Sequence, residues 1–286
     1  MAKDRFVNKT VIVAGGLGKL KGEEFKKGIG SACVELLKEE GANVVITDVD
    51  EALVKKAATV LGVKGIYKDL LKDRTYHEQE IKTDKGVKKE PVWDDHPALD
   101  LVKEVVNEFG AIDAVIMAFD YYEKGSVASV TSEKFDEMVT KNIWPVFHMF
   151  SAIRDQLAKQ AREGRPWAKV VNVISFVGKA GMSMGAVYAS MKGAMIGLNK
   201  SLAREFGRFA NVNAVAFGPL AEKNIAGVED RAKKQYMVTS TDLGQNKDIT
   251  IDKVAPLVVF LASSDADCIA GQTFSVDGGL WLKLEQ

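Results

Sequence analysis

Short apolar runs rich in β-branched residues alternate along this chain with longer amphipathic segments. The runs cover residues 10–14, 43–47, 114–118, 170–174, 211–216 and 273–276. The amphipathic segments cover residues 29–40, 51–61, 98–108, 132–160, 187–206 and 252–262. Near-continuous apolar strands are expected where a parallel sheet is covered on both faces. The alternation therefore predicts an α/β fold, a doubly wound parallel sheet with helices on both faces and a ligand at the carboxyl ends of its strands.

The chain is 286 residues long, which suits one domain spanning residues 1–286. Three polar segments interrupt the alternation, at about residues 17–27, 72–95 and 221–248. None of them is apolar enough for a core of its own, so we interpret them as insertions or loops on that domain. The segment 72–95 contains Asp84-Lys85-Gly86, a plausible turn, and is predicted to form a surface hairpin.

The charge balance excludes some classes of partner. Lys plus Arg and Asp plus Glu number 39 each, which gives no reason to expect nucleic acid or an anionic membrane surface. No apolar run approaches the roughly 20 residues that span a bilayer, and the first residues lack the apolar core of a signal peptide. We therefore expect a cytoplasmic protein, with Cys33 and Cys268 as buried core residues in a reducing compartment.

The histidines do not predict a metal site. His77, His96 and His148 have no metal-ligand spacing with one another or with the cysteines, so we expect no bound metal.

The pattern that carries chemistry follows the fourth of the long apolar runs. Ser175 ends that run, and Tyr188 and Lys192 follow within the next helix-like segment. On a helix, residues four apart share a face. An ammonium beside a phenol favours the phenolate, which lowers a pKa that is about 10 when unperturbed. Tyr188 is therefore a candidate acid/base, and Ser175 a candidate hydrogen-bond donor to a substrate oxygen.

With these residues in place, the chain resembles the short-chain dehydrogenase/reductase family over nearly its whole length. That family places a serine thirteen residues before the tyrosine and a lysine four after it, as Ser175, Tyr188 and Lys192 are placed here. Its fourth catalytic residue, an asparagine at a kink in the preceding long helix, matches Asn142. The resemblance implies a Rossmann-type sheet, with Lys192 also binding the nicotinamide ribose and Asn142 supporting a proton-relay water.

The cofactor side of the resemblance is less regular. Family members carry a glycine-rich turn after the first strand, which lets the backbone approach the pyrophosphate. Here Gly15-Gly16 begins the pattern and Gly28-Ile29-Gly30 completes it, with eleven residues between them. This insert carries Lys19, Lys21, Lys26 and Lys27. Two interpretations stay open: a loop that folds over the phosphates, or a solvated surface loop.

Further positions match cofactor-binding residues of the family. Asp48 ends the second strand, where a carboxylate accepts hydrogen bonds from the adenosine ribose and repels a 2′-phosphate, so the resemblance implies NAD rather than NADP. Asp69 and Leu70 match the pair at the adenine edge, and Leu220 matches the position whose backbone meets the nicotinamide amide.

The chain departs from the family at the end of the apolar run 114–118. The family has asparagine-asparagine-alanine-glycine, whereas this chain has Met117-Ala118-Phe119-Asp120. Two bracing amides are absent, and Phe119 adds bulk where the family keeps backbone close to the cofactor. We keep Ala118 as a cofactor-binding position.

The resemblance implies an NAD-dependent oxidoreductase that interconverts a secondary alcohol and a ketone, such as a 3-oxoacyl/3-hydroxyacyl-type substrate on a carrier thioester. It also implies a homo-oligomer, typically a tetramer, and a substrate lid at residues 221–248. The alternative is a catalytically silent subunit of a hetero-oligomer, kept for assembly or regulation. An enoyl reductase of the same superfamily is disfavoured because those enzymes space tyrosine and lysine more widely.

Overall fold

The computed structural model describes residues 4–72, 74–84, 86–220 and 249–279. Its main sheet has seven parallel strands in the order β11-β10-β9-β8-β1-β4-β5. These strands are β1 (Thr10–Ala14), β4 (Asn43–Thr47), β5 (Lys64–Gly65), β8 (Ala114–Met117), β9 (Ala168–Ser175), β10 (Ala210–Phe217) and β11 (Thr273–Val276). The long strands arise from the apolar runs, so the predicted doubly wound sheet is confirmed.

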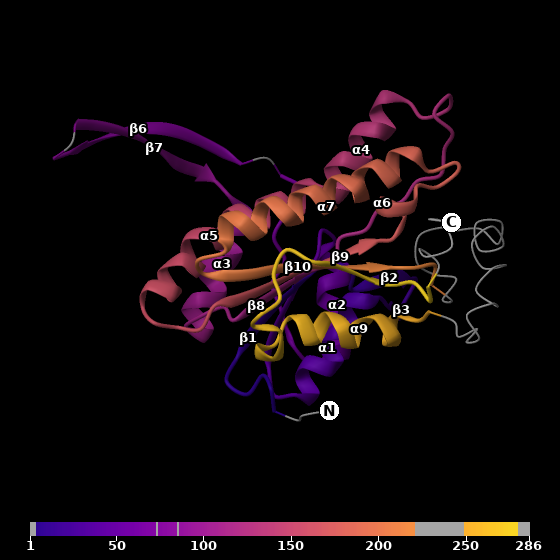
Figure 1. Cartoon of the computed structure of the whole chain (residues 1–286), viewed down its shortest axis with the longest axis horizontal. Helices are drawn as coiled ribbons and strands as arrows, with labels where there is room; N and C mark the ends of the chain where they lie inside the picture. The colour runs from indigo at the N-terminus through magenta and orange to yellow at the C-terminus, as the bar shows by residue number, and fades with distance from the viewer. Residues whose placement is uncertain (1–3, 73, 85, 221–248, 280–286) are drawn as a thin grey trace.

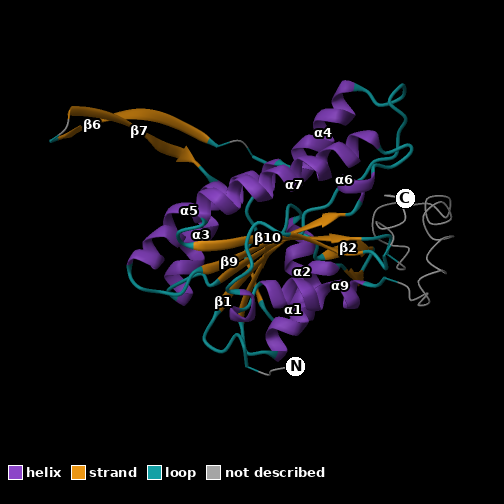
Figure 2. Ribbon diagram, viewed as in Figure 1, coloured by secondary structure: helices purple, strands orange, loops and turns teal. Residues whose placement is uncertain are grey.

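Helices cover both faces of the sheet (Figures 1 and 2). One layer contains α1 (Ile29–Glu39), α2 (Glu51–Leu61) and α9 (Ile251–Leu261). The other contains α3 (Pro97–Phe109), α5 (Trp144–Arg162) and α7 (Ala186–Phe206). Strand β1 shows how both faces of the sheet are buried. Val11 and Val13 pack into the first layer, and Ile12 and Ala14 pack into the second.

The single long helix expected over residues 132–160 is two helices. Helix α4 (Ser132–Asn142) ends where α5 begins at Trp144, and Ile143 lies between them. Pro145 stands in the first turn of α5, where its missing N–H costs no intrahelical hydrogen bond. The apolar periodicity passes through this break, which is why the sequence pattern alone joined the two helices.

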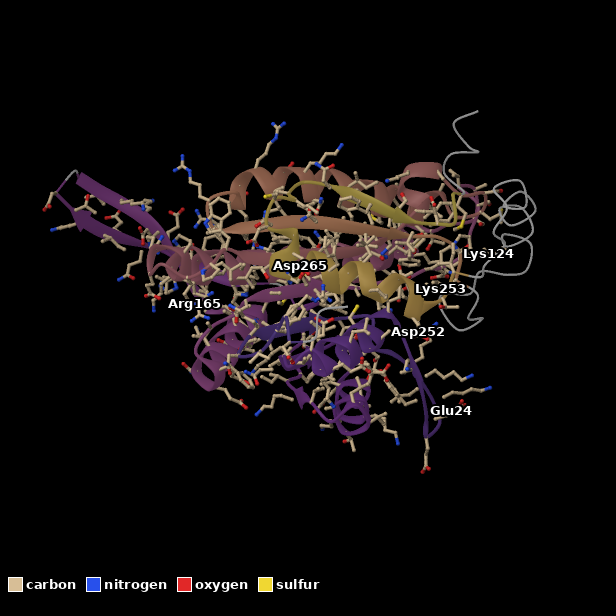
Figure 3. The ribbon with its side chains drawn as sticks, turned by 60° about the horizontal axis from the view of Figure 1, so that its bottom comes forward. Glu24, Lys124, Arg165, Asp252, Lys253 and Asp265 are labelled. Atoms are coloured by element: carbon tan, nitrogen blue, oxygen red, sulfur yellow. The ribbon has the colours of Figure 1, made fainter. Side chains whose placement is uncertain are left out.

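The first insert is a hairpin. Strands β2 (Gly18–Lys21) and β3 (Glu24–Lys27) pair antiparallel, and Figure 3 shows Glu24 at the outer end, away from the sheet. Leu17, which we had counted in the insert, is fully buried in the core. The insert proper therefore begins at Gly18.

The second insert is a longer antiparallel hairpin of β6 (Thr75–Thr83) and β7 (Gly86–Asp95). It projects from the body of the molecule as a two-stranded arm (Figure 1). All the residues of β6 are exposed, as the density of charge in this segment predicts. The predicted lid at 221–248 lies outside the described residues.

The two cysteines, both expected to be buried, differ in the structure. Cys33 is buried in α1, as predicted, but Cys268 is exposed in the turn after the 3₁₀ helix Ser264–Ala266. The turn ends the apolar layer, so the thiol lies at the surface rather than in the core. In the part of the chain that is described, no helix is both long and apolar enough to cross a membrane.

Candidate active site

The two halves of the glycine pattern meet despite the insert between them. The Gly30 N–H donates to the Gly16 carbonyl at 2.8 Å, and the Gly28 N–H donates to the Leu17 carbonyl at 3.1 Å. A Cβ at Gly28 would lie 2.3 Å from the Gly16 oxygen, and one at Gly30 would lie 2.4 Å from the Gly15 oxygen. Only glycine fits such an approach, so the insert leaves the turn at the start of α1 intact.

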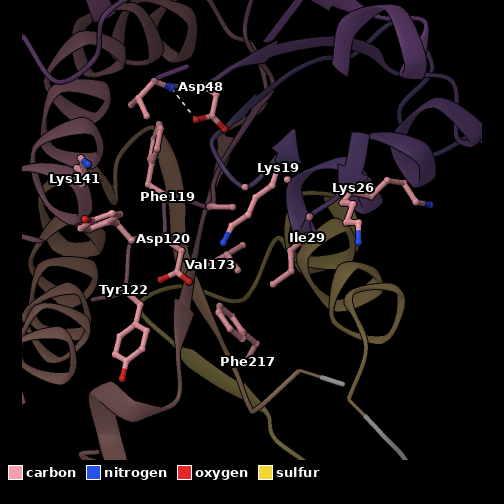
Figure 4. A pocket seen from close by; sticks show the side chains of 17 residues that line it. Lys19, Lys26, Ile29, Asp48, Phe119, Asp120, Tyr122, Lys141, Val173 and Phe217 are labelled. Carbon is pink, nitrogen blue, oxygen red and sulfur yellow. Dashed lines mark hydrogen bonds between the residues drawn. The ribbon is translucent and has the colours of Figure 1, made fainter. Parts of the chain in front are cut away.

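A cavity of about 380 Å³ lies over this turn at the carboxyl edge of the sheet (Figure 4). The glycine end of its wall includes Gly16, Gly28 and Ile29. The β2–β3 hairpin contributes Lys19, Lys26 and Lys27, and in Figure 4 the Lys19 side chain extends into the cavity. The wall also includes Asp48, Val49, Ala118, Phe119, Asp120, Tyr121, Tyr122, Lys141, Val173 and Phe217.

Asp48 lies at the end of β4 beside the glycine turn. Its carboxylate accepts a hydrogen bond from the Val49 N–H at 2.8 Å, which fixes its orientation in the cavity wall. Only 8% of the residue is exposed, and burial raises the pKa of Asp48 to about 6. The carboxyl is therefore ionised at neutral pH and becomes neutral under mildly acidic conditions.

Three of the predicted catalytic side chains meet at the end of β9. Tyr188 and Lys192 lie on one face of α7, with the Lys192 Nζ 5.2 Å from the centroid of the Tyr188 ring. Ser175, the last residue of β9, makes a side-chain hydrogen bond with the Tyr188 hydroxyl. All three are buried, at 1–5% exposure, beside the Asp120 end of the cavity.

Asp120 joins this group, which the sequence analysis did not anticipate. One oxygen of its carboxylate, Oδ1, accepts the Tyr188 hydroxyl at 2.7 Å and lies 2.8 Å from the Lys192 ammonium. The sequence signal that could have revealed Asp120 is a charged residue shortly after β8, at a position where the family pattern has glycine.

The pKa of Tyr188 differs from the expectation. We predicted that Lys192 would lower it, but burial raises the pKa of Tyr188 well above 10, and the negative charge of Asp120 raises it further. The hydrogen bond with Ser175 acts in the opposite direction. The prediction was wrong because it counted the cation and omitted both the burial of the phenol and the carboxylate that pairs with the cation.

Asn142 lies at the helix break and holds the segment that carries Asp120. Its side-chain Nδ2 donates to the Tyr121 carbonyl at 2.8 Å, and its Oδ1 accepts the Tyr121 N–H at 3.2 Å. Asn142 is 1% exposed. Its side chain therefore braces the backbone next to Asp120.

Known proteins resemble this chain over nearly its whole length. Residues 22–281 match a family model described as enoyl-(acyl carrier protein) reductase. The chain is 27% identical to galactitol 2-dehydrogenase from Agrobacterium fabrum, over 97% of this chain and 99% of that protein. It is 28% identical to a 3-oxoacyl-[acyl-carrier-protein] reductase from Staphylococcus epidermidis, over 96% of this chain and 100% of that protein.

The chain belongs to the short-chain dehydrogenase/reductase family. It is thus an oxidoreductase of the short-chain alcohol dehydrogenase/carbonyl reductase type. Two solved structures share its fold. Levodione reductase has a TM-score of 0.76 at 21% identity, covering 97% of this chain and 99% of that one. A glucose/ribitol dehydrogenase from Brucella melitensis has a TM-score of 0.71 at 23% identity, covering 98% and 99%.

Not every predicted cofactor position of this short-chain dehydrogenase/reductase lies at the cavity. Asp69 is exposed, and its carboxylate accepts the Leu71 N–H at 3.2 Å, while Leu70 is fully buried. Leu220 is 7% exposed and pairs with Ile249, away from the cavity wall. Gly15 lies beneath the wall, against Phe119. The structure thus brings Gly28, Ile29, Asp48 and Ala118 together in the cavity wall, with Gly30 behind them in the glycine turn, and leaves Asp69, Leu70 and Leu220 outside the wall.

Proposed function

We propose that this protein is an NAD-dependent oxidoreductase that interconverts a secondary alcohol and a ketone. The observation that carries the proposal is the continuity of one site. A single cavity extends from the glycine turn and Asp48 to Asp120, and Tyr188 and Lys192 lie directly behind Asp120. Such an arrangement offers a dinucleotide site at one end and an acid/base at the other.

The residues present fit a nicotinamide cofactor. A Cβ at Gly16, Gly28 or Gly30 would lie within 3 Å of neighbouring protein atoms, so the tight turn at the start of α1, a type of turn that binds phosphate, requires glycine at these positions. Lys19 and Lys26 add positive charge at that end, and Asp48 offers an acceptor for a ribose hydroxyl. When bound, the cofactor supplies or accepts the hydride, and the protein provides orientation and electrostatics.

The proton chemistry falls to this chain's own side chains. In the reductive direction Tyr188 donates its hydroxyl proton to the carbonyl oxygen of the substrate, while Ser175 donates a hydrogen bond to the same oxygen. In the oxidative direction the Tyr188 oxygen accepts the proton of the alcohol. Lys192 stabilises the negative charge that develops on the phenol oxygen, and Asn142 holds the segment 120–122 in place.

The charge on Asp48 supports NAD over NADP, because a 2′-phosphate next to an ionised carboxylate would be repelled. The substrate class to examine first is a 3-oxoacyl or 3-hydroxyacyl thioester, since one relative is named for such a reaction. Galactitol and related polyols follow, because a second relative is named for galactitol oxidation. We further propose a cytoplasmic homo-oligomer, on the strength of the family resemblance alone.

Titration of NADH fluorescence on the pure protein tests the proposal most directly. Saturable enhancement with a Kd in the micromolar range supports an enzyme, and oxidation of NADH by a panel of 3-oxoacyl thioesters and ketones then identifies the substrate. Absence of NADH binding at millimolar concentration would favour a catalytically silent subunit. In that case affinity purification should recover a different partner chain.

A further inference from the structure

Asp120 stands between the two residues that form the acid/base pair. The same carboxylate oxygen lies 2.7 Å from the Tyr188 hydroxyl oxygen and 2.8 Å from the Lys192 Nζ. Lys192 Nζ also donates to the Phe119 carbonyl at 3.2 Å. The two groups closest to the ammonium are thus a carboxylate and a carbonyl, rather than the phenol oxygen.

This placement is enforced by the surrounding backbone. The two hydrogen bonds between Asn142 and the backbone of Tyr121 fix the residue next to Asp120. Further along the same segment, the Gly125 N–H donates to the Met184 carbonyl at 3.0 Å, which ties the segment to the start of α7. The Asp120 side chain is 14% exposed and that of Lys192 is 1% exposed. Asp120 therefore belongs to the wall of the site and is not a freely moving surface residue.

We propose that Asp120 is a positioning residue that holds the Tyr188 hydroxyl protonated, by accepting its hydrogen bond and by drawing the Lys192 ammonium to itself. If Tyr188 lost its proton, two anionic oxygens would face each other at hydrogen-bond distance, and the one nearby ammonium would contact the carboxylate. Like charges at such a distance cannot both ionise easily in a buried site. The role rests on the proposed function, in which Tyr188 is the acid/base.

The other groups around Tyr188 do not cancel this effect. Tyr122 packs edge-on against its ring at 5.1 Å between centroids, and Ser175 is an uncharged hydrogen-bond partner. From α4, the Lys141 ammonium lies over the Tyr121 ring and is 2.6 Å from the Glu137 carboxylate. That cation is paired with its own anion. Burial and the charge of Asp120 both raise the pKa of Tyr188, whereas Ser175 lowers it.

The consequence is a shift of the whole pH profile. Proton donation by Tyr188 persists far into the alkaline range, and its use as a base from the ionised form begins only at high pH. The pH profiles of reduction and oxidation shift together, because both directions depend on the same ionisation of Tyr188. A relative with glycine at this position would lack the carboxylate and would ionise its tyrosine at lower pH.

Ultraviolet titration of tyrosinate tests this without cofactor or substrate. The chain has six tyrosines, so the contribution of Tyr188 is taken as the difference between each protein and its Tyr188→Phe partner. In the wild type, Tyr188 should contribute nothing until the protein unfolds in alkali. In Asp120→Asn, which keeps the shape and removes the charge, it should ionise at a pH at least one unit below that unfolding. Glu123→Gln, a neutralised carboxylate in the same segment that pairs with Lys134, should behave as the wild type.

The proposal is overturned if Tyr188 ionises at the same pH in Asp120→Asn and the wild type, or at higher pH in the variant. Circular dichroism verifies that each variant is folded; if Asp120→Asn is not, Asp120→Gly is measured in its place and judged by the same shift. Because this titration needs no turnover, a protein that fails to bind NADH can still support the role of Asp120. Conversely, an active enzyme with an unchanged Tyr188 titration would refute the role of Asp120 and leave the proposed function standing.

Discussion

The Gly30 N–H donates to the Gly16 carbonyl at 2.8 Å across an insertion that separates the two residues in sequence. This contact restores the glycine turn and leaves the β2–β3 hairpin as an addition to its rim. The hairpin carries three lysines on the cavity wall, of which Lys27 is paired with Glu35, and a fourth, Lys21, that is exposed and not part of the wall. Substitutions of Lys19 and Lys26 in the wall, compared with a substitution of Lys21 outside it, therefore distinguish direct contact with a phosphate from an effect of the overall charge of the hairpin.

We expect Lys19→Ala and Lys26→Ala each to weaken NADH binding about three- to tenfold, since a charge-assisted contact in a partly exposed site contributes on the order of 1 kcal/mol. Lys21→Ala should change the affinity by less than about twofold. Replacing residues 18–27 by two glycines should weaken binding further and leave the fold intact. Isothermal titration at low and high salt measures these effects. Equal losses for Lys19 and Lys21 would mean that the hairpin acts only through its overall charge.

The preference between NAD and NADP should depend on pH through Asp48. Burial raises the pKa of Asp48 to about 6, so the carboxylate that repels a 2′-phosphate is present above pH 6 and is lost below it. At pH 7.5 we expect NADH to bind at least about tenfold more tightly than NADPH, a difference of about 1.4 kcal/mol. The ratio of the NADPH dissociation constant to that of NADH should fall toward one at pH 5.3 and in the Asp48→Asn variant. Asp50→Asn, which keeps the cap of α2, is the matched control. A ratio independent of pH would refute the role of Asp48.

Acid should destabilise the protein through His96. The His96 side chain accepts the Leu99 N–H at 3.3 Å and caps α3, which requires a neutral nitrogen. Burial, together with the charge of Arg74, lowers the pKa of His96 to about 4. A lowered pKa in the folded state means that the stabilisation is complete above the unfolded value near 6.5 and is lost as pH falls toward 4.

Between pH 7.5 and pH 5 this linkage removes about 2 kcal/mol from the free energy of unfolding. Because the raised pKa of Asp48 acts in the opposite direction over the same interval, the loss is measured by urea denaturation at the two pH values as the difference between the wild type and a His96 variant. His96→Asn, which keeps a capping side chain, should lose about 2 kcal/mol less than the wild type over this interval. His77→Asn, on the exposed β6–β7 hairpin, should behave as the wild type. Identical pH dependence in all three proteins would exclude His96 as the cause.

Tyr188→Phe should greatly reduce turnover, because the ring keeps its shape and loses the transferable proton. We expect kcat to fall by about 10²–10⁴-fold, with NADH affinity changed by less than about threefold. Tyr122→Phe, which alters the aromatic neighbour of Tyr188, is the control and should retain most of the activity. Stopped-flow or steady-state assays on the identified substrate supply the measurement. Undiminished turnover in Tyr188→Phe would reassign the proton donor.

The β6–β7 arm should be dispensable for folding. Two-stranded hairpins alone are marginally stable, and this one contacts the body mainly at its base, where Arg74 lies 4.7 Å from the centroids of both Trp93 and Phe147. Deleting residues 76–92 and joining the ends with glycine and serine keeps those three side chains. The melting temperature should fall by less than about 5 °C, which corresponds to at most about 1–2 kcal/mol for a chain of this size. A collapse of the melting temperature would place the arm in a subunit interface or the core.

The sequence pattern predicted the central strands β1, β4, β8, β9 and β10 well because each is a short apolar run buried on both faces. The run around Val170 and the run around Val212 were only slightly short of the strands that contain them. The break at Ile143 could not be placed by periodicity, since apolar residues continue at helical spacing through it.

The site was predictable only where it is local in sequence. The spacing of Tyr188 and Lys192 within one helix sufficed to place them on one face. The contact between Asp120 and Tyr188 joins residues 68 positions apart and depends on how the segment after β8 packs against α7. Burial of the phenol and the charge of Asp120 together raise the pKa of Tyr188, and the spacing of Tyr188 and Lys192 reveals neither.

The junction between Leu17 and Gly28 has a practical use. Because the backbone hydrogen bond at 3.1 Å already brings these two positions together, a foreign peptide spliced between them would have its ends closed by the host turn. Gly28, at one end of the splice site, belongs to the cavity wall. A small environment-sensitive fluorophore or a peptide tag placed there would report occupancy of the neighbouring site as a change in emission, which would convert this chain into a sensor of its own ligand.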